Sequence, residues 1–177
     1  KILGKRPLVV NGDMKTHVGL SGLADKTGLG ADLIAAAEGA YKSYKLPCII
    51  VNMGTATTMT MVDKDGEFRG GVILPGMKTS LNALTLSAAI LPDIRLDHPG
   101  SAIGFNTEEC MRNGIIYGNA SQIDGITARM EEEIGEPCTV VATGGMAKFC
   151  VSACRRKVTL DDKIIMTGLL SLYELNR

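Results

Sequence analysis

Residues 48–73 decide the fold, and they read CIIVNMGTATTMTMVDKDGEFRGGVI. The first four residues, Cys48–Val51, form an apolar run rich in β-branched side chains, which is typical of a strand buried on both faces. Residues 57–62 and 67–73 flank an Asp-Gly pair at positions 65 and 66, a strong signal for a β-hairpin. We therefore predict three strands in succession, with a hairpin between the second and the third.

Helical patterns surround these strands. Residues 31–43 place alanines at helical spacing, and Pro47 ends that helix. Asn106, with Glu109 three residues later, predicts the start of a long helix, which we expect to break near Gly114 or Gly118. The remaining predicted elements are strands at 7–12 and 138–142 and helices at 77–88, 146–153 and 164–175. This order predicts an α/β fold with a mixed sheet flanked by helices.

The composition excludes several classes of protein. Among 177 residues, 19 are Lys or Arg and 19 are Asp or Glu, so the charge gives no reason to expect nucleic acid or an anionic membrane as partner. Five cysteines without metal spacing argue against a secreted disulfide framework. No apolar run reaches the roughly 18 residues of a membrane span. We expect a cytoplasmic protein.

Three glycine-containing motifs are candidates for chemistry. The turn after the first strand, Asn52–Thr58, would let backbone N–H groups and threonine hydroxyls approach a phosphate, although a Thr-rich edge strand explains it equally well. Gly144 and Gly145 follow a second buried strand, as in a nucleotide site or a plain turn. Asp32, behind Gly28 and Gly30, is either a general base or a carboxylate that compensates the helix dipole.

In this order and spacing, the motifs resemble those of the type III pantothenate kinases, in the same fold superfamily as acetate and sugar kinases and actin. The motifs that carry the resemblance are Gly30–Asp32, Ile49–Thr58, Gly70–Gly76, Leu91-Pro92, Thr107–Glu109 and Ala142–Gly145. The resemblance implies a ribonuclease H-like second kinase domain at 47–177, preceded at 1–46 by a remnant of the first domain with the substrate loop and connecting helix. We expect the rest of that first domain, with its phosphate-gripping Asp-x-Gly-Asn-Thr turn, to lie outside this chain.

The resemblance also implies a reaction and its participants. The reaction is ATP-dependent phosphorylation of pantothenate, the first step of coenzyme A synthesis, in a homodimer that uses Mg²⁺ and a monovalent cation such as K⁺ or NH₄⁺. Asp32 matches the proton acceptor. The residues that match pantothenate contacts are Gly30, Ala31, Asp32, Leu33 and Thr107. The residues that match the ATP side are Gly54, Thr55, Thr57, Gly144 and Gly145, and Asn52 matches the ligand of the monovalent cation.

Three positions depart from the family pattern. Leu33 stands where the family has an arginine that holds the substrate, Asn52 where it has a cation-binding aspartate, and Thr60 where an acidic residue is common. These departures support an alternative function, a catalytically impaired paralogue that acts as a structural, regulatory or heterodimer subunit of a pantothenate kinase. In a third interpretation, the protein keeps the phosphotransferase fold but acts on a different substrate, because the apolar Leu33 disfavours binding of a substrate carboxylate.

Overall fold

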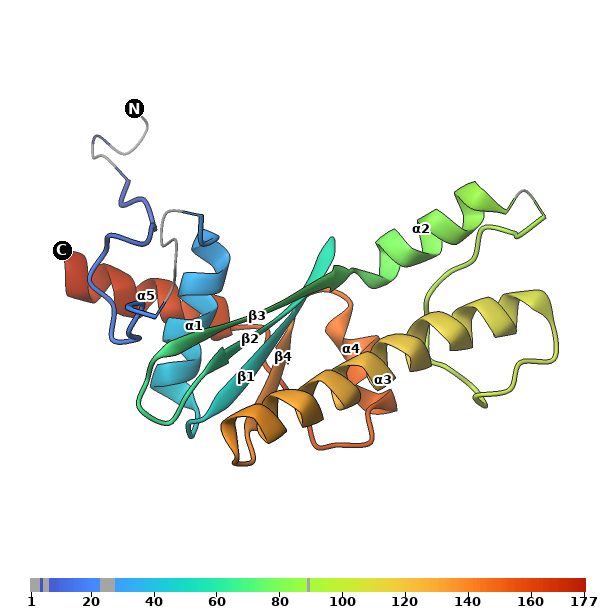
Figure 1. Cartoon of the computed structure of the whole chain (residues 1–177). Helices are drawn as coiled ribbons and strands as arrows, with labels where there is room; N and C mark the ends of the chain where they lie inside the picture. Colours follow the sequence, from blue (N-terminus) through green and yellow to red (C-terminus); the bar gives the residue numbers. More distant parts are fainter. Residues whose placement is uncertain (1–3, 5–6, 23–27, 89) are drawn as a thin grey trace.

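The computed structural model describes residues 4, 7–22, 28–88 and 90–177. One mixed sheet runs through it in the order β3-β2-β1-β4-β5 (Figure 1). Its strands are β1 (Cys48–Met53), β2 (Ala56–Val62), β3 (Phe68–Pro75), β4 (Thr139–Thr143) and β5 (Thr159–Leu160). β2 is antiparallel to both of its neighbours, β1 and β3, whereas β4 runs parallel to β1 and β5 parallel to β4. The predicted mixed sheet and its hairpin are confirmed, and β5 was too short to show any periodicity in the sequence.

The helices follow the predicted ranges closely. They are α1 (Ala31–Ser43), α2 (Met77–Ser87), α3 (Thr107–Ile134), α4 (Ala147–Cys150) with a 3₁₀ turn η1 (Val151–Ala153), and α5 (Ile164–Asn176). Asn106 caps α3 as predicted, because its side chain accepts a hydrogen bond from the Glu109 N–H at 2.9 Å. The predicted break in α3 near Gly114 or Gly118 is wrong. A glycine inside a helix costs only about 1 kcal/mol, and the buried isoleucines of α3 hold the helix continuous across both.

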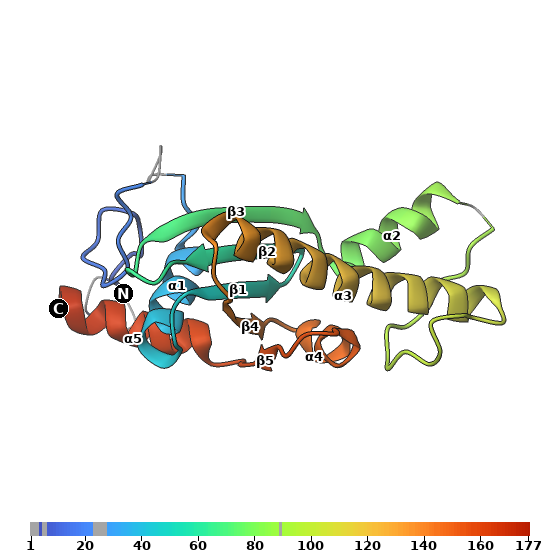
Figure 2. The same ribbon diagram turned by 60° about the horizontal axis from the view of Figure 1, so that its bottom comes forward.

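The two faces of the sheet are covered by different helices (Figure 2). Alanines of α1 pack against one face, where Cys48 and Ile50 of β1 point. The long helix α3 covers the other face, where Met53 of β1 and Met59 of β2 are buried. Because successive side chains of a strand alternate between faces, the even-numbered residues of β1 and β2 share the α1 side. That side carries the candidate site.

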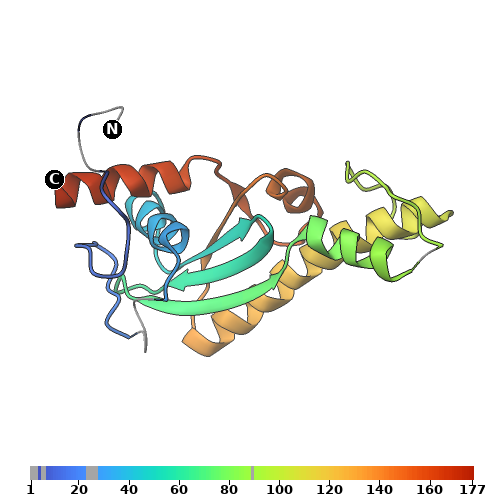
Figure 3. The same cartoon turned by 90° about the horizontal axis from the view of Figure 1, so that it is seen from above.

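α5 packs beside α1 (Figure 3). The crossing is close because it is built on glycine: a β-carbon on Gly39 of α1 would stand 2.0 Å from the carbonyl oxygen of Ile164. The small-residue face predicted for the 31–43 helix therefore serves helix packing. It lets α5 hold α1 against the sheet.

The segment before α1 is not a strand, so the strand predicted at 7–12 is wrong. Val10 and Met14 pack against the α1–α5 pair. Asn176 of α5 accepts a hydrogen bond from the Lys15 N–H at 3.0 Å and donates one to the Lys15 carbonyl at 2.9 Å. An apolar run forms a strand only where a sheet edge accepts it, and this run lies on helices instead.

A buried carboxylate fixes the chain at residues 17–19. Glu38 of α1 is fully buried and accepts hydrogen bonds from the His17 N–H at 3.0 Å and the Ser171 hydroxyl at 2.8 Å. The His17 ring nitrogen Nδ1 also contacts Glu38. Two residues on, Gly19 pairs with the β2–β3 hairpin through hydrogen bonds to Gly66 and Phe68. Residues 17–19 are thereby tied both to α1 and to the sheet.

α2, the described part of the connection after it and the first turns of α3 extend beyond the sheet, away from α1 and α5 (Figures 1 and 3). We call residues 77–88 and 90–118 the arm. Several of its large apolar side chains are exposed, among them Leu86, Ile90, Ile103 and Phe105. Large exposed apolar side chains on a projecting element are typical of a protein contact surface.

All five cysteines are free thiols, in agreement with the prediction that there is no disulfide framework. Cys48 and Cys150 are buried, whereas Cys110 is exposed. In the part of the chain that the structure describes, no helix combines the length and the apolar character needed to cross a membrane.

Candidate active site

Asp32 and Asn52 meet on the α1 side of the sheet. Asp32 lies in the first turn of α1, and Asn52 is the second-last residue of β1. The side-chain amide of Asn52 donates a long hydrogen bond, 3.4 Å, to carboxylate oxygen Oδ2 of Asp32. Gly30, the N-cap of α1, lies so close that a β-carbon there would stand 2.7 Å from the other oxygen, Oδ1. The residues predicted for proton transfer and for cation binding are therefore neighbours.

Two threonines extend this pair across the sheet. Asn52 lies opposite Thr58 of β2 and opposite Thr143 of β4 in the strand register. All three side chains share the α1 side, so a polar row crosses three strands beneath Asp32. The hydroxyl of Thr58 is buried and has no hydrogen-bond partner among the described residues. A buried hydroxyl without a hydrogen-bond partner raises the free energy of the folded state, so a ligand that bonds to it would be favoured.

The row ends at a topological switch point. After β1 the chain turns back into β2 on one side, and after β4 it passes through α4 and η1 to β5 on the other side. In open sheets, ligands bind in the crevice that such diverging connections leave at the carboxyl ends of parallel strands. By this rule a ligand is expected beside the turn at Gly54-Thr55 and the turn at Gly144-Gly145, a place that we call the crevice.

The two turns touch each other. Gly144 has a φ of 99°, and a β-carbon there would stand 2.6 Å from the Met53 carbonyl oxygen, so only glycine permits this approach. A β-carbon on Gly145, in contrast, meets nothing within 4 Å. Gly145 therefore borders open space, and its contact with ATP stays a prediction.

Thr55 is held in place by the start of α2. Its carbonyl oxygen accepts hydrogen bonds from the Gly76 N–H at 3.1 Å and from the Thr79 hydroxyl at 2.7 Å. The closeness of Gly76 to this turn again excludes a side chain, because an added β-carbon would stand 2.4 Å from the Thr55 oxygen. The turn after β1 is thus rigidly placed while Thr55 itself stays exposed.

The structure does not bring every predicted residue to this cluster. Thr57 is 1% exposed and, by alternation, points to the α3 side of the sheet, away from Asp32. Thr107 begins α3 in the arm, which extends away from α1 (Figure 1). Leu33 follows Asp32 on α1 and is half-buried. Within this chain, Thr57 and Thr107 therefore lie apart from the Asp32–Asn52 pair, and their ligand contacts stay predictions.

Sequence reasoning missed Thr58 and Thr143. The signal that could have found Thr58 is the alternation of side chains along a strand. Once Gly54 and Thr55 are placed in the turn, Asn52 falls opposite Thr58, so the two side chains lie on the same face of the sheet. Thr143 needs the further information that β4 pairs parallel with β1, which the separate strands do not reveal.

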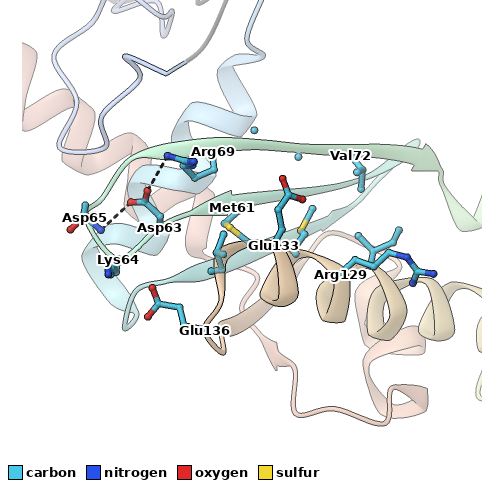
Figure 4. Close-up of a pocket in the computed structure, with 14 residues that line it drawn as sticks. Met61, Asp63, Lys64, Asp65, Arg69, Val72, Arg129, Glu133 and Glu136 are labelled. Atoms are coloured by element: carbon cyan, nitrogen blue, oxygen red, sulfur yellow. Dashed lines mark hydrogen bonds and ion pairs between the residues drawn. The ribbon is translucent and has the colours of Figure 1, made fainter.

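A cavity of about 690 Å³ lies elsewhere, between the β2–β3 hairpin and the second half of α3 (Figure 4). Its floor includes Met61 and Val72, which face α3, and its rim carries charges of both signs. In Figure 4, Glu133 points from α3 toward β3, and Arg69 pairs with Asp63 at 3.7 Å. Since this cavity is on the face opposite Asp32, it is not part of the candidate site.

Known structures share this fold. A Campylobacter jejuni protein described as a conserved member of the Baf family of transcriptional activators superposes on 83% of this chain and 64% of its own, with a TM-score of 0.61 and 20% identity. The Alp12 filament structure covers 81% of this chain and 51% of its own, with a TM-score of 0.53 and 9% identity. At these identities, the likeness shows the fold.

Sequence comparison gives the family. A profile described as type III pantothenate kinase matches residues 1–129. Curated proteins named type III pantothenate kinase are 41% identical in Paramagnetospirillum magneticum, over 96% of this chain and 65% of theirs, and 39% identical in Jannaschia sp., over 85% and 58%. This chain thus spans less than two thirds of the length of these relatives. With the Asp32 cluster and the two glycine turns in the family's order, the chain belongs to the type III pantothenate kinase family.

Proposed function

We propose that the protein carrying this chain phosphorylates pantothenate with ATP, giving 4′-phosphopantothenate and ADP in the first step of coenzyme A synthesis. The observation that carries the proposal is the Asp32–Asn52 pair beside two glycine turns at a switch point. The turns supply backbone for the phosphates, and the carboxylate supplies a base at their edge. The names of the related proteins support the same reaction.

Asp32 is the proton acceptor in this proposal. Its carboxylate accepts a hydrogen bond from the primary hydroxyl of pantothenate and takes the proton as the hydroxyl oxygen bonds to the γ-phosphorus of ATP. The bond between that phosphorus and the β,γ-bridging oxygen breaks, and ADP leaves with the electron pair.

The phosphates lie along the two turns. Gly145 and the exposed Thr55 border the crevice, and the Thr58 hydroxyl is a further donor toward it. Mg²⁺, which prefers oxygen ligands and stays largely bound to nucleotide phosphates, would neutralise their charge, with Asp32 the nearest carboxylate of the cluster. These residues fit ATP with its Mg²⁺.

The monovalent cation fits the site poorly. Asn52, which matches the family's cation ligand, is neutral and turns its N–H toward Asp32. Thr60, on the same face of β2, is neutral too and 5% exposed. Cations of this kind are held by oxygen ligands and negative charge. We therefore route no step through such an ion.

A homodimer is the second part of the proposal. Thr107, which matches a pantothenate contact, lies in the arm and away from Asp32 of the same chain. The arm also exposes Leu86, Ile90, Ile103 and Phe105. A second copy that covers the arm would bury these side chains and bring Thr107 to the partner's substrate site. Light scattering on Phe105→Ser should then show a monomer, whereas a dimer that persists would contradict this interface.

The reaction is tested on the purified full-length protein with Mg-ATP and pantothenate, with phosphopantothenate detected by mass spectrometry. Asp32→Asn should lower the rate by about 10² to 10⁴, the usual contribution of a general base. Asp162→Asn, the same change at an exposed aspartate, is the matched control. No product at any substrate concentration would contradict the proposal and favour the paralogue that acts as a heterodimer subunit, which co-purification with a second kinase chain would reveal.

A further inference from the structure

The pairing of Asp32 with Asn52 has a consequence for the ions that the site needs. The two side chains lie within hydrogen-bond distance, with the Asn52 amide nitrogen 3.4 Å from Asp32 Oδ2. A carboxylate only accepts hydrogen bonds, so the amide presents its N–H and not its oxygen to Asp32. The contact is therefore attractive and needs no third group between the two side chains.

An aspartate at position 52 would make the same contact repulsive. Two carboxylates at this separation repel each other, and a cation between them relieves the repulsion. A site with two acids here thus depends on a cation, whereas Asn52 and Asp32 are held together by a hydrogen bond alone.

The described strand residues around the pair are neutral. Thr58 and Thr143 flank Asn52 in the register, and Thr60 lies two residues along β2 on the same face. In the described part of the chain, no group of three or more His, Cys, Asp or Glu side chains is placed to hold a metal ion. Among these described residues, Asp32 supplies a carboxylate, Asn52 an amide and the threonines hydroxyls.

We propose that the side-chain amide of Asn52 takes the place of a monovalent cation beside Asp32, so that this enzyme works without K⁺ or NH₄⁺. The inference rests on the proposed function, because it concerns the side chain that contacts the proposed base. It also predicts the reverse change: Asn52→Asp installs a requirement for K⁺.

The first experiment measures phosphopantothenate formation by the full-length protein in KCl and in choline chloride at equal ionic strength. The wild-type rate should differ by less than twofold between the two salts. The rate of Asn52→Asp should fall at least tenfold when choline replaces K⁺. Asn11→Asp adds the same charge at an exposed position and should behave as the wild type. A wild-type rate that falls tenfold without K⁺ overturns the proposal.

The second experiment does not depend on turnover. Thermal melting in the two salts detects K⁺ binding directly, since an ion that binds the folded state raises the melting temperature. The wild type should melt at the same temperature in both, and Asn52→Asp should melt higher in KCl. A specific rise for the wild type, or no rise for the variant, overturns the assignment to Asn52. If the wild type makes no product in either salt, the proposed function fails while the melting data still decide this inference.

Discussion

Gly168 of α5 lies directly against Ala35 of α1: a β-carbon on Gly168 would stand 1.8 Å from the Ala35 carbonyl oxygen. The obstacle is backbone, so no side-chain rotation can relieve it. Asp32 is on the same helix as Ala35, so the closeness of this crossing also sets where the carboxylate lies.

Gly168→Ala should therefore destabilise the fold. Forcing the two helices apart in a packed core costs about 1 to 3 kcal/mol, and this contact is tight enough to reach the upper part of that range. Chemical denaturation measures the change in the free energy of unfolding. Gly125→Ala is the matched control, because its β-carbon meets only the Arg129 side chain at 3.6 Å and alanine favours a helix. Equal stability of both variants would contradict the packing described.

The two glycines of the turn after β4 should differ in their roles, one in the stability of the fold and the other in ATP binding. Gly144→Ala should unfold the protein more easily, since the residue has a φ of 99° and meets the Met53 backbone. Gly145→Ala should keep the melting temperature but weaken ATP binding, because its new methyl group enters the open crevice. Melting curves and nucleotide titration distinguish the two. Full ATP affinity in Gly145→Ala would remove that glycine from the site.

The missing arginine at position 33 can be restored. Leu33→Arg should lower the KM for pantothenate by about 10- to 150-fold, since a hydrogen bond between charged groups contributes about 1.5 to 3 kcal/mol. Steady-state kinetics with pantothenate and with its uncharged alcohol analogue measures the effect. Leu170→Arg, at an exposed position of α5 outside the arm, serves as control. A wild type that uses the uncharged analogue better than pantothenate would support the interpretation that the enzyme has changed its substrate.

The Glu131–Arg156 pair predicts a dependence of stability on pH. The Arg156 guanidinium donates to both carboxylate oxygens, at 3.1 and 3.0 Å, and holds the pKa of Glu131 below its ordinary value. The folded state therefore binds fewer protons than the unfolded chain, whose Glu131 pKa is about 4.5. The stabilisation is fully present above that pH and is lost as the pH falls through the lower pKa of the folded state.

Glu131→Gln should thus lower stability at pH 7 by about 1 kcal/mol and weaken its decline in acid. Urea denaturation from pH 3 to pH 7 measures both effects. Glu132→Gln, on the exposed side of the same helix, should leave the pH profile unchanged. A profile for Glu131→Gln identical to that of the wild type would show that the ion pair does not contribute.

The cysteines should react in a fixed order. Burial raises the pKa of the Cys48 thiol to about 12, so almost none of it is thiolate at neutral pH. Cys110 is exposed, and the thiol of Cys150 lowers the pKa of the half-buried Cys154. Alkylation followed by mass spectrometry should label Cys110 and Cys154 long before Cys48. Labelling of Cys48 at the same rate would mean that the sheet opens readily.

The sequence predicts elements best where local chemistry sets their limits. The helix at 31–43 has matching bounds because small residues form it and Pro47 lies just beyond, and the β2–β3 hairpin follows from Asp65-Gly66. The strand at 7–12 fails because an apolar run does not say whether it meets a sheet edge or a helix. The Asp32–Asn52 contact could not be predicted from spacing, since it joins a helix start to a strand end across the tertiary fold.

The packing of α5 on α1 also constrains when this protein can fold during synthesis. Residues 44–163 separate the two helices in the chain, and the ribosome adds them before α5 emerges. Until then the alanine and glycine face of α1 lacks the helix that covers it, and only the sheet side of α1 is packed. The sheet can assemble early, but Asp32 is fixed in its final place only after α5 has left the exit tunnel.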